Sequence, residues 1–103
     1  MNQIEELTKK CQKVVEKYKI TYPDVKMDRD YLPFKITEEW GELMQTYLML
    51  TDRGRQKGKT KEEIVNMMEM EFADMFAYLL VFAKNENIDL VQALNNKWFK
   101  YLE

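Results

Sequence analysis

Two short acidic motifs carry the clearest chemistry in this sequence. The first is Glu38-Glu39-x-x-Glu42, and the second, further along the chain, is Glu71-x-x-Asp74. Residues three or four apart share one face of an α-helix, so each motif would present its carboxylates together. A carboxylate that is buried without a partner costs several kcal/mol, and such acids therefore normally hold a cation. Carboxylates from two facing helices suit a hard divalent ion such as Mg²⁺, which often shares its coordination sphere with phosphates.

The setting of the second motif favours a buried site more strongly than that of the first. On a helical wheel, Glu71 and Asp74 fall within an apolar stripe. The stripe consists of Ile64, Met67, Met75, Tyr78 and Phe82. The acids of the first motif lie beside a second stripe, formed by Ile36, Trp40, Leu43, Tyr47 and Leu50. Taken alone, the first motif would be interpreted as a solvated polar face, and the second motif makes a shared cation site the better interpretation.

Apolar spacing and end signals predict about four helices that position these motifs. The first spans residues 2 to about 20 and places the only cysteine, Cys11, on its packing face. The second follows Asp30, a possible cap, and runs to about residue 52. The third starts at the capping box Thr60-Lys61-Glu62-Glu63 and runs to about residue 84. Asp89 caps the last, whose apolar stripe continues to Leu102 and includes Trp98 as a core or subunit-interface residue.

Composition supports one all-α domain over residues 1–103. The chain has 46% hydrophobic and 33% charged residues, but only three glycines and two prolines, which leaves little material for turns. Its net charge of −2 favours neither nucleic acid nor a membrane surface as a partner. There is no histidine, which excludes His-ligated metals and His bases. The single cysteine, the absence of a signal-peptide core and the short apolar runs predict a cytoplasmic protein.

The apolar stripes exceed what so short a chain can bury by itself. Each predicted helix carries one, and the third helix is apolar nearly all round in its middle, over residues 72–83. A small core gains from oligomerisation. We therefore expect helices 2 and 3 to pack antiparallel and a second subunit to complete a four-helix bundle, in a homodimer or homotetramer.

The two acidic motifs, in this order and on helices of this kind, resemble the signature of the MazG-like all-α nucleoside triphosphate pyrophosphohydrolases. Lys35-Ile36-Thr37 and Ile88-Asp89-Leu90-x-x-Ala93-x-x-x-Lys97 also look like that family. The resemblance implies hydrolysis of a nucleoside triphosphate to the monophosphate and pyrophosphate. It implies Mg²⁺, or Mn²⁺ in its place, as the cofactor, and the following ligands: Glu39, Glu42, Glu71 and Asp74.

Other site residues follow less directly. Family members often place an Asn and an Arg after the last-helix lysine, where this chain has Tyr101, so Lys97, Lys100 or the basic loop 53–61 are the candidates for phosphate contacts. That loop either folds over polyphosphate or is a solvated connector. Lys35 either pairs with an acid or contacts phosphate. Glu38 is not needed as a ligand and is predicted to orient or deprotonate water.

Two other classes of protein compete with the hydrolase. In the first, the helices form a non-catalytic oligomerisation or interaction module, and the acids mark a partner-binding or register-setting site. The second is a di-iron carboxylate bundle. That class normally needs Glu-x-x-His pairs, so the absence of histidine argues against it.

Overall fold

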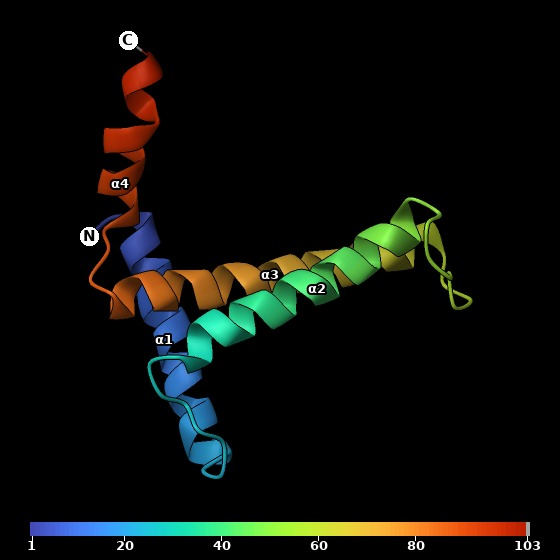
Figure 1. The fold of residues 1–103 in the computed structure, drawn as a ribbon, viewed down its shortest axis with the longest axis horizontal. Coiled ribbons are helices and arrows are strands. Elements are labelled where there is room, and N and C mark those ends of the chain that lie inside the picture. Colours follow the sequence, from blue (N-terminus) through green and yellow to red (C-terminus); the bar gives the residue numbers. More distant parts are fainter. Residues whose placement is uncertain (103) are drawn as a thin grey trace.

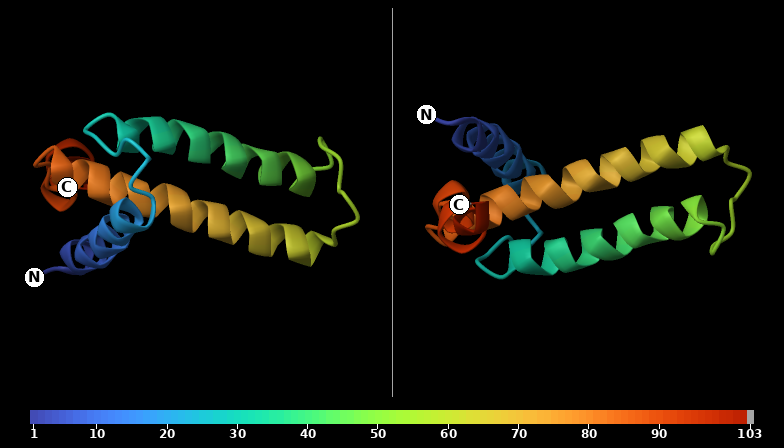
Figure 2. Two further views of the ribbon diagram at one scale, coloured as in Figure 1. Left: turned by 90° about the horizontal axis from the view of Figure 1, so that it is seen from below. Right: turned by 90° about the horizontal axis from the view of Figure 1, so that it is seen from above.

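The computed structural model describes residues 1–102, and over this range all of its regular secondary structure is helical, with no strand. Its elements are α1 (Gln3–Thr21), α2 (Tyr31–Leu50), α3 (Lys61–Asn85), α4 (Leu90–Lys97) and the 3₁₀ helix η1 (Phe99–Leu102). α2 and α3 run side by side in opposite directions as a long hairpin (Figure 1, Figure 2). The predicted all-α class and the antiparallel pair are therefore confirmed.

The remaining helices leave the molecule open. α1 crosses α3 near the end of the hairpin where α2 begins, while α4 and η1 extend away from the hairpin (Figure 1). The chain measures 48 × 43 × 21 Å, and its radius of gyration is 16.4 Å, against about 13 Å for a compact domain of this length. None of the helices in the described part of the chain is both long and apolar enough to span a bilayer.

A small core joins α1 to the base of the hairpin. Val15 of α1, Leu32 of α2 and Val81 of α3 are buried together, and Cys11 packs against them as predicted. Asn2 caps α1, since its side chain accepts a hydrogen bond from the Glu5 amide at 2.9 Å. This core fixes the end of the hairpin from which the acidic motif of α2 follows.

The start of α2 differs from the prediction. Asp30 occupies the cap position, but its backbone is helical (φ −84°, ψ −12°) and its side chain accepts no capping hydrogen bond. The chain enters the helix through a turn instead, in which the Tyr31 amide donates to the carbonyl of Asp28 at 3.2 Å. The carboxylate of Asp28 also accepts a hydrogen bond from the Asp30 amide. Asp28 thus accepts from the amides of Asp30 and Tyr31 at the entrance to the helix, and Pro33, at its third position, has no amide hydrogen that needs a cap.

The face that α2 buries is also different from the predicted stripe. Trp40 and Tyr47 were expected on the packing face, yet 52% and 47% of their surfaces are exposed. The buried residues of α2 are Leu32, Glu39, Leu43, Thr46 and Met49. The helix is therefore rotated toward its polar side, which brings Glu39 to the interface with α3.

The hairpin loop and the start of α3 are firmly held. Thr60 and Glu63 form the predicted capping box. The Lys61 ammonium donates to the carbonyl of Leu50 at 2.9 Å and pairs with the Asp52 carboxylate at 2.6 Å, which ties α3 to the end of α2. The other basic residues of the loop lie exposed at this far end of the hairpin; they are Arg53, Arg55, Lys57 and Lys59.

The last helix is shorter than its apolar pattern suggested. Asp89 caps α4 as predicted, by accepting from the Gln92 amide at 3.0 Å, but the α-helix ends at Lys97 and η1 follows. Trp98 is 66% exposed, so it does not belong to the core of the single chain. The prediction of a core role is therefore wrong for the single chain, while subunit-interface packing, which was favoured over base stacking, stays a prediction.

Candidate metal centre

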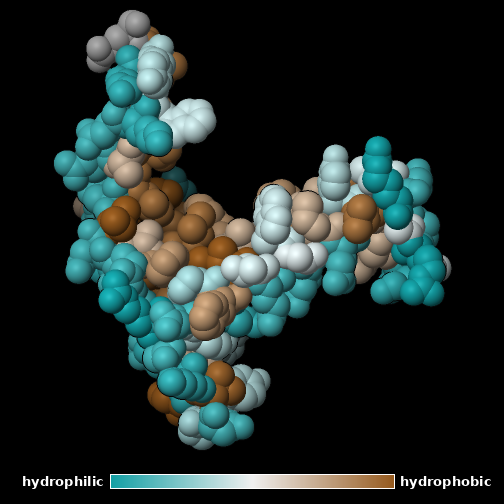
Figure 3. All heavy atoms as spheres, viewed as in Figure 1, coloured by the Kyte–Doolittle hydropathy of each residue, from teal (hydrophilic) through white to brown (hydrophobic). Residues whose placement is uncertain are grey.

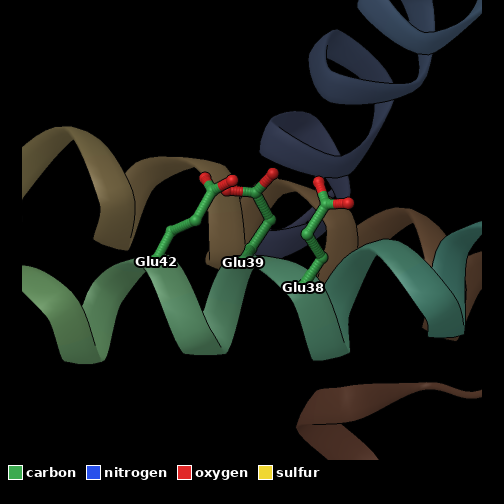
Figure 4. Close-up of side chains that lie close together, drawn as sticks. All are labelled: Glu38, Glu39 and Glu42. Carbon is green, nitrogen blue, oxygen red and sulfur yellow. The ribbon is translucent and has the colours of Figure 1, made fainter.

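Three carboxylates of α2 form one half of the site. Figure 4 shows that Glu38, Glu39 and Glu42 leave the helix on the side that faces α3, with Glu39 and Glu42 pointing toward each other. Each of the three offers a carboxylate oxygen within 4.8 Å of the others. The spacing of three and four residues puts them on one face, as the sequence predicted. Glu39 is the buried member, with only 7% of its side chain exposed.

α3 supplies the other half. Glu71 and Asp74 lie one turn apart on this helix, and an oxygen of each lies within 4.8 Å of an oxygen of Glu39. Glu71 is half-buried and Asp74 is exposed, so the cluster runs from the helix interface to the surface. Glu39 belongs to both groups of three. The structure thus gathers the other three predicted ligands, Glu42, Glu71 and Asp74, around the buried Glu39.

Two oxygens at the centre of this cluster have no hydrogen-bond partner. They are Oε2 of Glu39 and Oε2 of Glu71, and both are buried. An unsatisfied buried acceptor costs about 1–3 kcal/mol, and more when the group is charged. Glu39 and Glu71 come from facing helices and offer carboxylate oxygens within 4.8 Å of each other, so a cation bound by both residues would offset the cost of burying them.

The site also raises the pKa of its central acids. The pKa of Glu39 rises from 4.5 to about 7, chiefly because the carboxyl group is buried, and then because Glu42 and Asp74 lie close to it. Burial likewise raises the pKa of Glu71, with further contributions from the charges of Glu42 and Asp74. Lys35 acts in the opposite direction on Glu39, but does not cancel the effect of burial. The cluster is therefore short of positive charge.

The donor set fits a hard divalent cation. All candidate ligands are carboxylate oxygens, as Mg²⁺ and Mn²⁺ prefer, and the chain has no histidine that would favour a softer metal. Ligands at about 2.1 Å from Mg²⁺ lie at most about 4.2 Å apart. Within each group of three, the carboxylate oxygens lie within 4.8 Å of one another, so each group needs at most a small contraction to meet this geometry.

Lys35 pairs with acids of the cluster. Its ammonium nitrogen lies 2.6 Å from Oε1 of Glu38 and 3.6 Å from Oε1 of Glu39. The nitrogen also lies 5.9 Å from the centre of the Tyr78 ring, which α3 contributes. Of the two predicted roles of Lys35, pairing with an acid is the one that the structure contains.

The other predicted phosphate contacts do not gather at the cluster within one chain. Lys97 and Lys100 are exposed on α4 and η1, which point away from the hairpin (Figure 1), and the Lys100 ammonium lies 5.2 Å from the centre of the Tyr101 ring. The basic loop lies beyond Leu50, and the helix rise puts that residue about 12 Å past Glu42 along α2. Neither group of cations forms an ion pair with the cluster in the part of the chain that the structure describes.

Two tyrosines lie beside the cluster, although the sequence did not predict them as site residues. Tyr78 lies under Lys35, and burial together with the neighbouring Tyr31 raises the pKa of its hydroxyl group to about 12. Tyr78 follows Asp74 by one helical turn, so the spacing contained a signal that it shares the face of the acids. Tyr31, which comes from the start of α2, carried no such signal.

Comparison with known proteins gives no match. No protein-family model matches the chain, nor does any curated protein or any solved structure. The resemblance to the MazG-like pyrophosphohydrolases therefore rests on the two acidic motifs and their flanking residues alone. What the cluster does must be inferred from its own geometry and charge.

Proposed function

We propose that this protein is a Mg²⁺-dependent nucleoside triphosphate pyrophosphohydrolase of the MazG-like kind, with Mn²⁺ as a possible substitute ion. One observation carries the proposal: Glu39 and Glu71, on facing helices, each bury an unpartnered carboxylate oxygen within one acidic cluster. Purely structural acids would be expected to turn such oxygens to solvent or to a donor. Glu42 and Asp74 complete the proposed ligand set.

The chemistry follows from the repulsion between a triphosphate and any incoming nucleophile. A divalent ion held by these carboxylates would neutralise phosphate charge and lower the pKa of a bound water. Glu38 is the proposed group that orients that water or takes its proton, because its side chain is 56% exposed at the edge of the cluster. Its hydrogen bond to Lys35 holds the carboxylate in place.

A second subunit is part of the proposal, because the chain exposes more surface than a folded monomer should. Its accessible area is 8174 Å², against about 6,200 Å² expected for this mass. In Figure 3 apolar side chains gather in the angle between α3 and α4. The large exposed hydrophobic residues of these two elements and η1 are Val65, Met70, Phe72, Phe76, Leu79, Leu94, Phe99, Tyr101 and Leu102.

The excess of about 2,000 Å² per chain is the scale of area that obligate subunits bury. A dimer or tetramer that covers this surface would complete the hairpin into a four-helix bundle. Because α4 and η1 point away from their own hairpin, Lys97 and Lys100 would contact phosphate only at the site of another subunit. Trp98, exposed on the same segment, would then pack at the interface.

The test is a panel of canonical, deoxy and damaged nucleoside triphosphates with Mg²⁺, in which pyrophosphate and orthophosphate are measured separately. Pyrophosphate and the monophosphate should appear together, and Glu71→Gln should abolish their release. Glu69→Gln, the same change at an exposed position of α3, should leave it intact. Release of orthophosphate with a diphosphate would refute the reaction. No hydrolysis of any nucleotide would favour the non-catalytic interaction module.

A further inference from the structure

We propose that Lys35 is a built-in counter-ion of the acidic cluster, which stabilises the cluster when no metal is bound and weakens the binding of a divalent cation beside it. The inference rests on the proposed function, since it concerns the same metal centre. It assigns Lys35 to positioning the carboxylates and setting metal affinity, which is different from a contact with substrate.

The ion pairs single out Lys35. It contacts one oxygen of Glu38 at 2.6 Å and one oxygen of Glu39 at 3.6 Å. In residues 1–102 no other lysine or arginine forms an ion pair with Glu38, Glu39, Glu42, Glu71 or Asp74. Five carboxylates therefore share a single ammonium group, whose loss would leave their mutual repulsion without a paired positive charge.

The two oxygens of Glu39 are divided between different environments. Oε1 faces the Lys35 ammonium, while Oε2 is buried without a partner. At 3.6 Å the Lys35 ammonium attracts one side of the central carboxylate without a hydrogen bond, and the other side stays open for a cation. A metal ligand that is held on one side and open on the other is pre-oriented, because its rotation is restricted before the ion arrives.

Lys35 is also restrained from leaving. Only 25% of its side chain is exposed, and its ammonium nitrogen lies 5.9 Å from the centre of the Tyr78 ring of α3. An ammonium over the face of an aromatic ring is attracted to it. The lysine therefore stays near the cluster when a divalent ion binds, and the two positive charges repel each other across Glu39.

Removing the charge of Lys35 should have two opposite effects. Without metal, Lys35→Gln leaves Glu38 and Glu39 uncompensated, so the variant should unfold at a lower temperature than the parent in EDTA. With metal, the repulsion disappears, and the affinity for Mn²⁺ should increase roughly tenfold or more, as expected for charges a few ångströms apart near a protein surface. A merely structural lysine would weaken both properties together.

The experiment uses the full chain and Mn²⁺ as the probe, with binding followed by electron paramagnetic resonance and calorimetry, and melts recorded in EDTA. Lys35→Arg keeps the charge and should bind Mn²⁺ like the parent. Lys59→Gln removes a positive charge at the exposed hairpin loop and should change neither property. If Lys35→Gln is unfolded in EDTA, its Mn²⁺ affinity is obtained from the refolding curve after correction for its unfolding equilibrium, which denaturant melts at several Mn²⁺ concentrations supply.

The outcomes separate this inference from the function on which it rests. Tighter Mn²⁺ binding by Lys35→Gln, together with a lower melting temperature in EDTA, supports the counter-ion. Equal or weaker binding by Lys35→Gln, in a parent that binds Mn²⁺ and releases pyrophosphate, overturns the counter-ion alone. A parent that binds no Mn²⁺ removes the metal centre, and with it the proposed function.

Discussion

Glu39→Gln tests directly how much the metal-free acidic cluster destabilises the fold. Glu39 is the buried carboxylate that both groups of acids share. The glutamine keeps the length and shape of the side chain and removes its charge. Its amide can donate a hydrogen bond to a neighbouring carboxylate, such as that of Glu42 or Glu71. The variant should therefore be more stable than the parent at neutral and alkaline pH when metal is absent.

The size of the effect follows from the pKa of Glu39, which the fold raises from 4.5 to about 7. Below pH 4.5 the group is protonated in both the folded and the unfolded chain, and it costs nothing. Between pH 4.5 and 7 the unfolded chain loses the proton first, so the free energy of unfolding falls as pH rises. Above pH 7 the decrease in the free energy of unfolding is complete. For a rise of about 2.5 units in the pKa of Glu39 it amounts to at most about 3.4 kcal/mol.

The assay is denaturant unfolding followed by circular dichroism in EDTA, from pH 4.5 to pH 8, at fixed protein concentration. The parent should lose stability across this window, and Glu39→Gln should lose much less. At pH 8 the difference should approach 3 kcal/mol, which corresponds to about 10 °C or more in melting temperature for a chain of this size. Addition of Mg²⁺ should stabilise the parent and have a much smaller effect on Glu39→Gln, which lacks one ligand charge.

Glu69→Gln is the matched control, because it makes the same change at an exposed site on α3 and should behave like the parent. The reasoning is refuted if Glu39→Gln is less stable than the parent in EDTA at pH 8. It is also refuted if both proteins gain equally from Mg²⁺, since Glu39 would then not be a ligand.

Two further predictions concern assembly and packing. Phe72, which is 53% exposed on α3, should lie in the subunit interface. Phe72→Glu should therefore convert an oligomeric parent to a monomer, as measured by light scattering, and a parent that is already monomeric at micromolar concentration would contradict the assembly. Ile64 is fully buried between the helices, so Ile64→Ala should lower the free energy of unfolding by about 2–5 kcal/mol in denaturant melts, and a loss below about 1 kcal/mol would show that the hairpin core is looser than the structure indicates.

The sequence by itself determined the helices and the grouping of the acids. Local signals sufficed for the start of α3, where Thr60 and Glu63 reciprocally satisfy the end of the helix, and for the cap of α4 at Asp89. The same holds for the spacing that puts Glu39 beside Glu42, and Glu71 beside Asp74. These features depend on backbone hydrogen bonds and on the 3.6-residue period of the helix. Both act within a few residues, so they can be predicted from one sequence.

Only the tertiary structure decided which side of each helix faces its neighbour. The apolar pattern placed Trp40 and Tyr47 inside and Glu39 beside the stripe, yet Glu39 is buried and both aromatic residues are exposed. The pattern also extended the last helix to Leu102, whereas α4 ends at Lys97 in a segment with no buried residue. The rotation of α2 about its axis is set by its packing against α3 and α1 together. The apolar pattern of one helix does not predict where these packing partners lie.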